Sequence, residues 1–96
     1  MYARLITAHI QPTKLEEFAS EFSRVILPAV SREHGFKCMY VMRDAAQNKF
    51  TTLVVWETES DALGSIEGYL NQRLPQMANF LAGQPSAETL EVLLRA

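Results

Sequence analysis

The chain has 96 residues, of which 48% are hydrophobic, and its nine basic and eleven acidic residues give a formal charge of −2. This length predicts a single domain over residues 1–96. The interspersed charges and acidic balance argue against nucleic acid or an anionic membrane as a partner. One cysteine, no secretory leader pattern and no apolar run of membrane-spanning length lead us to expect a cytoplasmic protein.

The first half of the chain predicts a strand, a helix and a second strand. Residues 2–10 interleave apolar and polar side chains, and Pro12 ends that strand. Thr13 and Glu16 have the spacing of a capping box. Apolar residues then follow at helical spacing: Leu15, Phe18, Phe22, Val25, Ile26 and Val30. Pro28 should kink or end the helix, and Gly35 marks the exit into a strand over 36–43.

The second half predicts a strand, a helical region and a closing strand. The short polar connection 44–49 favours an antiparallel hairpin between strands 36–43 and 50–57. A helical region starts near Ser60, is broken by Pro75 and ends at 83–85, before a strand over 87–94. The order β-α-β-β-α-β predicts an α+β, ferredoxin-like fold, with a four-stranded antiparallel sheet and both helices on one face.

The strands over 36–42 and 50–56 carry apolar or aromatic side chains on both faces. A half-exposed strand would instead alternate with polar residues. Because the element order supplies helices for one face only, we expect a second copy of the sheet to cover the other face, which predicts a homodimer. Periodicity does not decide which face meets the helices.

Three segments carry a family resemblance: Gly35-Phe36, the run 53–63 with its Trp56-Glu57 pair, and Glu91-Val92. This pattern resembles the antibiotic biosynthesis monooxygenase family, which implies a dimeric α+β barrel. The family includes cofactor-independent oxygenases acting on quinol-like aromatics, haem-degrading relatives and members without known activity. The haem-degrading branch uses a histidine in the second helical region, and residues 61–83 contain none. The resemblance therefore implies no cofactor.

A cofactor-free oxygenase needs a base, hydrogen-bond donors for an oxyanion and a dry aromatic pocket. His9, near the end of the first strand, is a candidate base, or else an internally satisfied or exposed strand histidine. Trp56 could donate its indole N–H and line the pocket with its flat ring, or else it fills space in the core. Tyr69 and Arg73 lie four residues apart on one helix face and could bind an anionic oxygen, or else cover the sheet as ordinary amphipathic side chains.

Other reactive residues have simpler explanations. His34 suits a helix C-terminus. Cys38 lies in an apolar strand with no adjacent charge to lower its pKa, which disfavours a nucleophile. The two histidines make no recognisable metal site. RNA-recognition modules share this element order, but they display basic residues on their central strands, and residues 50–57 contain no Lys or Arg.

Two functions therefore remain open. The first is a homodimeric, cofactor-independent monooxygenase acting on a small aromatic quinol or phenol, with His9, Trp56, Tyr69 and Arg73 as its site residues. The second is a non-catalytic homodimer of the same fold that binds a small ligand or has a stress or regulatory role.

Overall fold

The computed structural model describes residues 1–64 and 77–96. Its elements follow the predicted order, and a helix over 59–64 begins where the second helical region was predicted, near Ser60. The named elements are β1 (Tyr2–His9), α1 (Leu15–Glu21), the π-helical segment η1 (Phe22–Ile26), α2 (Leu27–Val30), β2 (Phe36–Asp44), the 3₁₀ turns η2 (Ala45–Gln47) and η3 (Ala78–Phe80), β3 (Lys49–Trp56) and β4 (Ser86–Glu91). The predicted Pro75 break lies outside the described residues.

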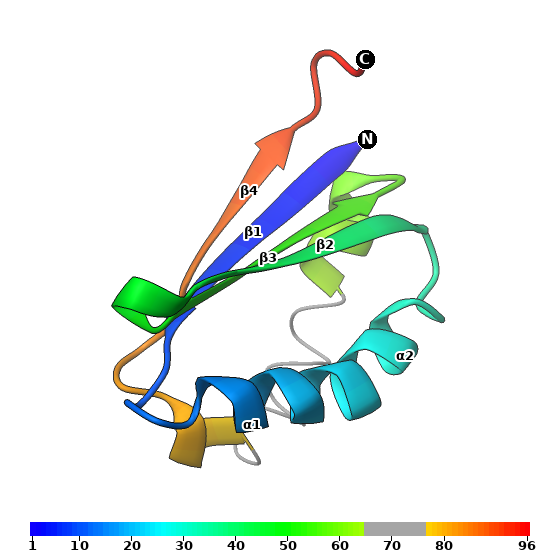
Figure 1. The fold of residues 1–96 in the computed structure, drawn as a ribbon. Coiled ribbons are helices and arrows are strands. Elements are labelled where there is room, and N and C mark those ends of the chain that lie inside the picture. The colour runs from blue at the N-terminus through cyan, green and yellow to red at the C-terminus, as the bar shows by residue number, and fades with distance from the viewer. Residues whose placement is uncertain (65–76) are drawn as a thin grey trace.

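The four strands form one antiparallel sheet in the order β2-β3-β1-β4. Helices α1 and α2 lie against one face of this sheet, while no described element covers the other face (Figure 1). We call these the helix-facing surface and the outer surface. This arrangement confirms the predicted ferredoxin-like α+β fold.

Strand β3 alternates strictly between the two surfaces. Phe50, Thr52, Val54 and Trp56 are buried on the helix-facing surface, and the residues between them are partly exposed. Two apolar clusters form there. Phe18 and Phe50 centre the first, whereas Val54 and Trp56 pack with Ile26, Val30 and Ala62 in the second. Phe22 contacts both clusters and so joins the two halves of the core.

A bulge in β2 separates residues that share a parity in the sequence. Phe36 is opposite Trp56, but Cys38 is opposite Val55, so one extra residue is inserted at this point. Phe36 therefore packs edge-on against Trp56 on the helix-facing surface, at a ring-centroid distance of 5.9 Å. Cys38 and Tyr40 lie on the outer surface, although they share the parity of Phe36 in the sequence.

Pro28 interrupts the regular helix, as predicted, without ending it. The five residues 22–26 adopt π-helical hydrogen bonding, and Pro28 then occupies the first turn of α2. A proline lacks an amide hydrogen and crowds the carbonyl four residues earlier, and a wider turn accommodates both defects.

Two predicted element ends are wrong. The capping box does not form, because Thr13 has a left-handed φ of 72° and Lys14 is the N-cap, with no side-chain cap hydrogen bond. The closing strand stops at Glu91 instead of reaching residue 94, since Tyr2 is the last residue of β1 to pair with it. Leu93 and Leu94 are consequently exposed.

Candidate functional site

Trp56 is the last residue of β3 and lies at the centre of the second core cluster. Its side chain is 1% exposed and packs among residues of η1, α2 and the helix 59–64. The bulge in β2 brings the edge of Phe36 against it. The alternation of β3, the bulge and Ala62, which is fully buried, together fix the ring in place.

The indole N–H of Trp56 has no hydrogen-bond partner among the described residues, although the atom is buried. Most buried polar groups in proteins are hydrogen-bonded, so an unpaired one needs an explanation. An indole nitrogen only donates, which means that the missing partner is an acceptor.

A second buried, unpaired donor lies on the same surface. Arg4 of β1 is opposite Val54 of β3, so it is the diagonal neighbour of Trp56. Its Nη1 donates to the Thr89 hydroxyl at 2.6 Å, but its Nε is buried without a partner. Diagonal neighbours have Cα atoms about 7–8 Å apart, within reach of long side chains. The two unsatisfied N–H groups therefore belong to neighbouring strands and to the same surface of the sheet.

Among the described residues, the helix-facing surface is less completely buried over β1 and β4 than over β3. Ile6 and Thr89, which flank Arg4 on β1 and β4, are partly exposed, and Ala87 opposite Ile6 is exposed. The tightly packed part of this surface is the β3 side, around Val54 and Trp56.

His9 is not brought together with Trp56. Trp56 is opposite Tyr2 and His9 is opposite Lys49, so seven residues of β1, or about 24 Å, separate the two ends. The exposed His9 also has the parity of the outer surface, together with Leu5 and Thr7. Tyr69 and Arg73, the other predicted site residues, lie outside the described residues.

His34 forms a second polar cluster with Asp61 and Thr58 at the start of the helix 59–64. Its Nδ1 lies 3.0 Å from Asp61 Oδ1, and the Thr58 hydroxyl donates to Asp61 Oδ2 at 2.9 Å. The hydrogen bond with Asp61 raises the pKa of His34, and the same bond lowers the pKa of Asp61. The imidazole is 94% exposed. His34 therefore has a specific carboxylate partner, and its helix-dipole role stays a prediction.

The pKa of Glu57 is also lowered, because Lys37 donates a hydrogen bond to its carboxylate. Gly35 links this region to the core. Its φ is +82°, its carbonyl accepts from the Glu57 amide at 2.7 Å, and Asp61 fills the space that a Cβ would need. The turn therefore requires glycine.

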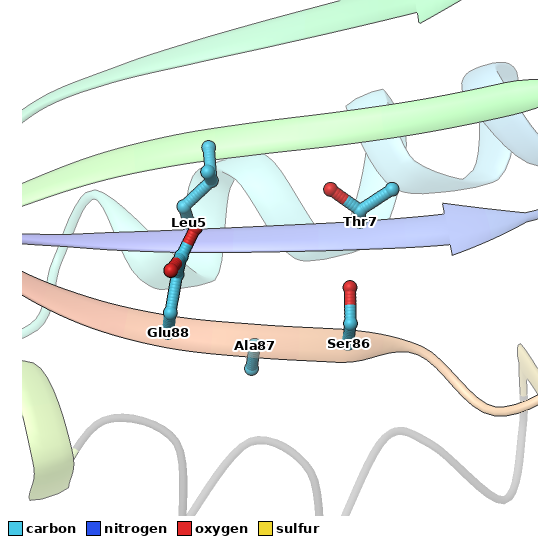
Figure 2. Close-up of a pocket in the computed structure, with 5 residues that line it drawn as sticks. All are labelled: Leu5, Thr7, Ser86, Ala87 and Glu88. Atoms are coloured by element: carbon cyan, nitrogen blue, oxygen red, sulfur yellow. The ribbon is translucent and has the colours of Figure 1, made fainter.

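The outer surface carries an open hollow of about 250 Å³ between β1 and β4. It is lined by Leu5, Thr7, Ser86, Ala87 and Glu88. Figure 2 shows the Leu5, Thr7 and Ser86 side chains on this side of the sheet, while Ala87 points away from them. Neither His9 nor Trp56 lines it.

Metal ligands do not gather in the described part of the chain, where no three His, Cys, Asp or Glu side chains lie close enough to hold an ion. Cys38 is an exposed free thiol on the outer surface. Within residues 1–64 and 77–96, no helix combines the length and apolar character needed to cross a bilayer.

The fold and the buried tryptophan define a ferredoxin-like α+β protein with a donor-bearing surface between sheet and helices. The chain belongs to the antibiotic biosynthesis monooxygenase family, whose model matches residues 1–65. No curated protein matches significantly.

Solved structures share the fold. A candidate antibiotic biosynthesis monooxygenase from Nitrosomonas europaea is 24% identical, with a TM-score of 0.80 over 98% of this chain and 100% of that one. A second Nitrosomonas europaea protein, of unknown function, is 18% identical, with a TM-score of 0.84 over 99% and 91%. A variant of SnoaB, a cofactor-independent oxygenase from Streptomyces nogalater, is 13% identical, with a TM-score of 0.77 over 98% and 94%.

Sequence reasoning missed Arg4. The available signal was a charged residue in a strand that is otherwise apolar or neutral up to His9. Parity alone could not place its side chain, because the register with β3 decides that Arg4 shares a surface with Trp56.

Proposed function

We propose that this chain is a cofactor-independent monooxygenase that oxidises a small aromatic quinol or phenol and works as a homodimer. The observation that carries the proposal is the indole N–H of Trp56 at the end of β3, which is buried and has no partner among the described residues. Family membership and the shared fold with SnoaB support it.

The proposed reaction needs neither metal nor organic cofactor. Loss of a proton from an activated CH₂ or phenol gives a carbanion or phenolate, which transfers one electron to dioxygen. The substrate radical and superoxide combine into a peroxide, and loss of water leaves a carbonyl. One dioxygen is consumed, one oxygen atom enters the product and the other leaves as water. The protein's contribution is to stabilise the anion and exclude bulk water.

The proposed roles divide between the two surfaces. Trp56 donates to the substrate oxygen on the helix-facing surface, and Tyr69 and Arg73 are proposed to complete that site. His9 belongs to the outer surface, so it would act only on a molecule bound there. We further propose that the protein works in the cytoplasm without nucleic-acid or membrane partners.

The homodimer is proposed from the outer surface. Tyr40, Met42 and Leu90 are 61%, 44% and 48% exposed there, although strands usually bury such side chains. Leu53 and Val55 continue the same apolar surface on β3. A second copy would cover this surface and enclose the hollow beside β4.

Oxygen uptake tests the enzymatic function. Purified protein, treated with chelator, is mixed with a panel of hydroquinones and anthrones, and dioxygen consumption is compared with autoxidation. We expect acceleration by the wild type, and a loss of roughly 10²-fold in kcat/KM for Trp56→Phe, which keeps a flat ring but loses the donor. Unchanged autoxidation across the panel would refute the enzymatic proposal for those substrates.

The second candidate is a non-catalytic homodimer that binds a small ligand. The separation of His9 from Trp56 favours it, because these two residues do not form one base-and-donor site. Thermal stabilisation by quinols without any product in mass spectrometry would support this alternative, and turnover would exclude it.

A further inference from the structure

We propose that the hydrogen bond between His34 and Asp61 is a pH-sensitive clamp on the Trp56 end of the core. The clamp holds tightly while the imidazole is protonated and loosens when the imidazole becomes neutral. It follows from the contacts of these residues alone. Its consequence for catalysis, a pH-dependent release of the indole, rests on the proposed function, in which Trp56 takes part.

The first step is what covers the indole. Trp56 is buried, and two segments that are distant in sequence pack against it. One segment runs from Val30 of α2 to Phe36 of β2, and both of these residues contact the cluster around the ring. The other segment is the start of the helix 59–64, which contributes the fully buried Ala62. Separation of the two segments would therefore open the core beside the indole.

The second step is how the two segments are joined. His34 belongs to the first segment and Asp61 to the second, and their side chains meet at 3.0 Å. Gly35 lies so close to the Asp61 side chain that no Cβ would fit between them. The Thr58 hydroxyl donates to Asp61 Oδ2 at 2.9 Å and accepts from the Asp61 amide at 3.1 Å. One carboxylate thus belongs to the cap of its own helix and also binds the opposite segment.

The third step is the proton. A carboxylate only accepts, so His34 donates from Nδ1 to Asp61, and the second proton of the imidazolium is carried by Nε2. Protonation turns a neutral donor into a charged one, which strengthens the hydrogen bond. The bond to Asp61 accordingly raises the pKa of His34, and the charge of Glu57 acts in the same direction. Protonated His34 favours the closed clamp, and this advantage is lost as pH rises through the folded pKa.

Other charged groups also lie around the clamp. Glu57 faces the imidazole in addition to Asp61. The remaining groups are Lys37, which binds the Glu57 carboxylate, the N-terminal ammonium, which acts on the same carboxylate, and Arg32 and Glu33, which precede His34 in the sequence. A pH dependence must therefore be assigned to His34 by substitution.

Hydrogen exchange of the indole N–H measures the opening. Trp56 is the single tryptophan of the chain, so its indole proton gives one NMR signal. The exchange rate of N-acetyltryptophanamide, divided by that of the protein at the same pH, gives a protection factor free of the intrinsic effect of pH. We expect this factor to fall as pH rises between the ordinary His34 pKa of 6.5 and its raised value.

Thermodynamic linkage fixes the size of the fall. It should equal the ratio of the acid dissociation constant of His34 in the Asp61→Asn variant to that in the wild type, because the variant lacks the charged partner. NMR titration of the imidazole supplies both constants independently. The protection factor of Asp61→Asn itself should vary little over the same pH range.

His34→Gln and His9→Gln make the same change at the two histidines of the chain. His34→Gln should make the protection factor independent of pH, and it should fold because the imidazole is exposed. His9→Gln should keep the wild-type profile, since His9 lies at the other end of β1 from the residue opposite Trp56. Low concentrations of urea should barely change a local opening, whereas they steeply raise exchange that requires unfolding of the whole chain.

A wild-type protection factor that stays constant over this pH range, or that changes equally in His34→Gln and His9→Gln, would overturn the inference. An indole that exchanges together with the slowest amides of β3 at every urea concentration would overturn it too. The experiment uses neither substrate nor turnover, so the two proposals fail separately. A clamp that operates without quinol oxidation refutes the oxygenase alone, and quinol oxidation with pH-independent protection refutes the clamp alone.

Discussion

The two surfaces of the sheet have similar apolar composition but opposite environments. Val54 and Trp56 on the helix-facing surface are buried by α2 and the helix 59–64, whereas Tyr40 and Met42 on the outer surface have no described neighbour above them. The apolar side chains of these strands therefore serve two kinds of contact. One kind is made within the chain, and we propose that the other is made between copies.

Removing the ring of Trp56 should have the largest effect on stability. Trp56→Ala leaves a cavity in a fully packed cluster and should lower the free energy of unfolding by about 3–5 kcal/mol. Chemical denaturation measures this loss. Tyr40→Ala on the outer surface is the control, and at concentrations low enough to separate copies it should cost less than about 1 kcal/mol. Similar losses for both variants would contradict the comparison between the two surfaces.

A charge on the outer surface should disrupt the proposed dimer. Met42→Glu would bury an unpaired carboxylate between copies and should weaken self-association by about 2 kcal/mol or more, measured by analytical ultracentrifugation. Val41→Glu is a matched control, because Val41 is 42% exposed, adjacent in β2 and on the helix-facing surface. Equal association of the two variants would show that the outer surface is not the interface.

Gly35→Ala should destabilise the chain by about 1–3 kcal/mol. The added Cβ would need a left-handed backbone and would collide with the Asp61 side chain. Gly64, which has open space around its Cα, is the control site for the same substitution. Thermal unfolding of both variants provides the comparison, and an unaffected Gly35→Ala variant would contradict the close approach of the turn to Asp61.

The smallest effect concerns pH. The raised pKa of His34 stabilises the fold below its ordinary value of 6.5, and this contribution is lost as pH rises through the folded pKa. The lowered pKa of Asp61 stabilises the fold above its ordinary value of 3.8, and that contribution is lost as pH falls through the folded pKa. The pair therefore contributes most between about pH 4 and 6.5.

NMR titration of the His34 ring tests this pairing. Asp61→Asn should return the pKa of His34 toward 6.5. Glu59→Gln removes an equal charge two residues away, without a hydrogen bond to His34, and should leave most of the shift. If the two variants move the His34 titration equally, the general field of the acidic helix start is responsible, and the specific bond is not.

The sequence predicted the fold class because strand parity, helical spacing and Gly35 all indicated the same arrangement. It also singled out Trp56 as a candidate. It failed where the result depends on pairing between distant segments. The inserted residue at the start of β2 moves Phe36 to the helix-facing surface, and only the register with Val55 reveals it.

The same limit explains the candidate site. His9 and Trp56 are both plausible functional residues by type, but antiparallel pairing of β1 with β3 places them at opposite ends of the sheet. The position of Arg4 is defined by its pairing with Val54 and its hydrogen bond to Thr89, which lie 50 and 85 residues further along the chain. No local pattern contains that information. The roles of His9, Trp56, Tyr69 and Arg73 stay predictions.

The π-helical segment η1 determines which side of the first helix meets the sheet. In a regular α-helix, a four-residue repeat such as Phe18, Phe22, Ile26 and Val30 drifts by about 40° at each step. The wider turn at 22–26 opposes this drift, so Phe18 and Val30 both reach the core although they are three turns apart. Deleting one residue there would rotate α2 by about 100° and turn Val30 away from the indole.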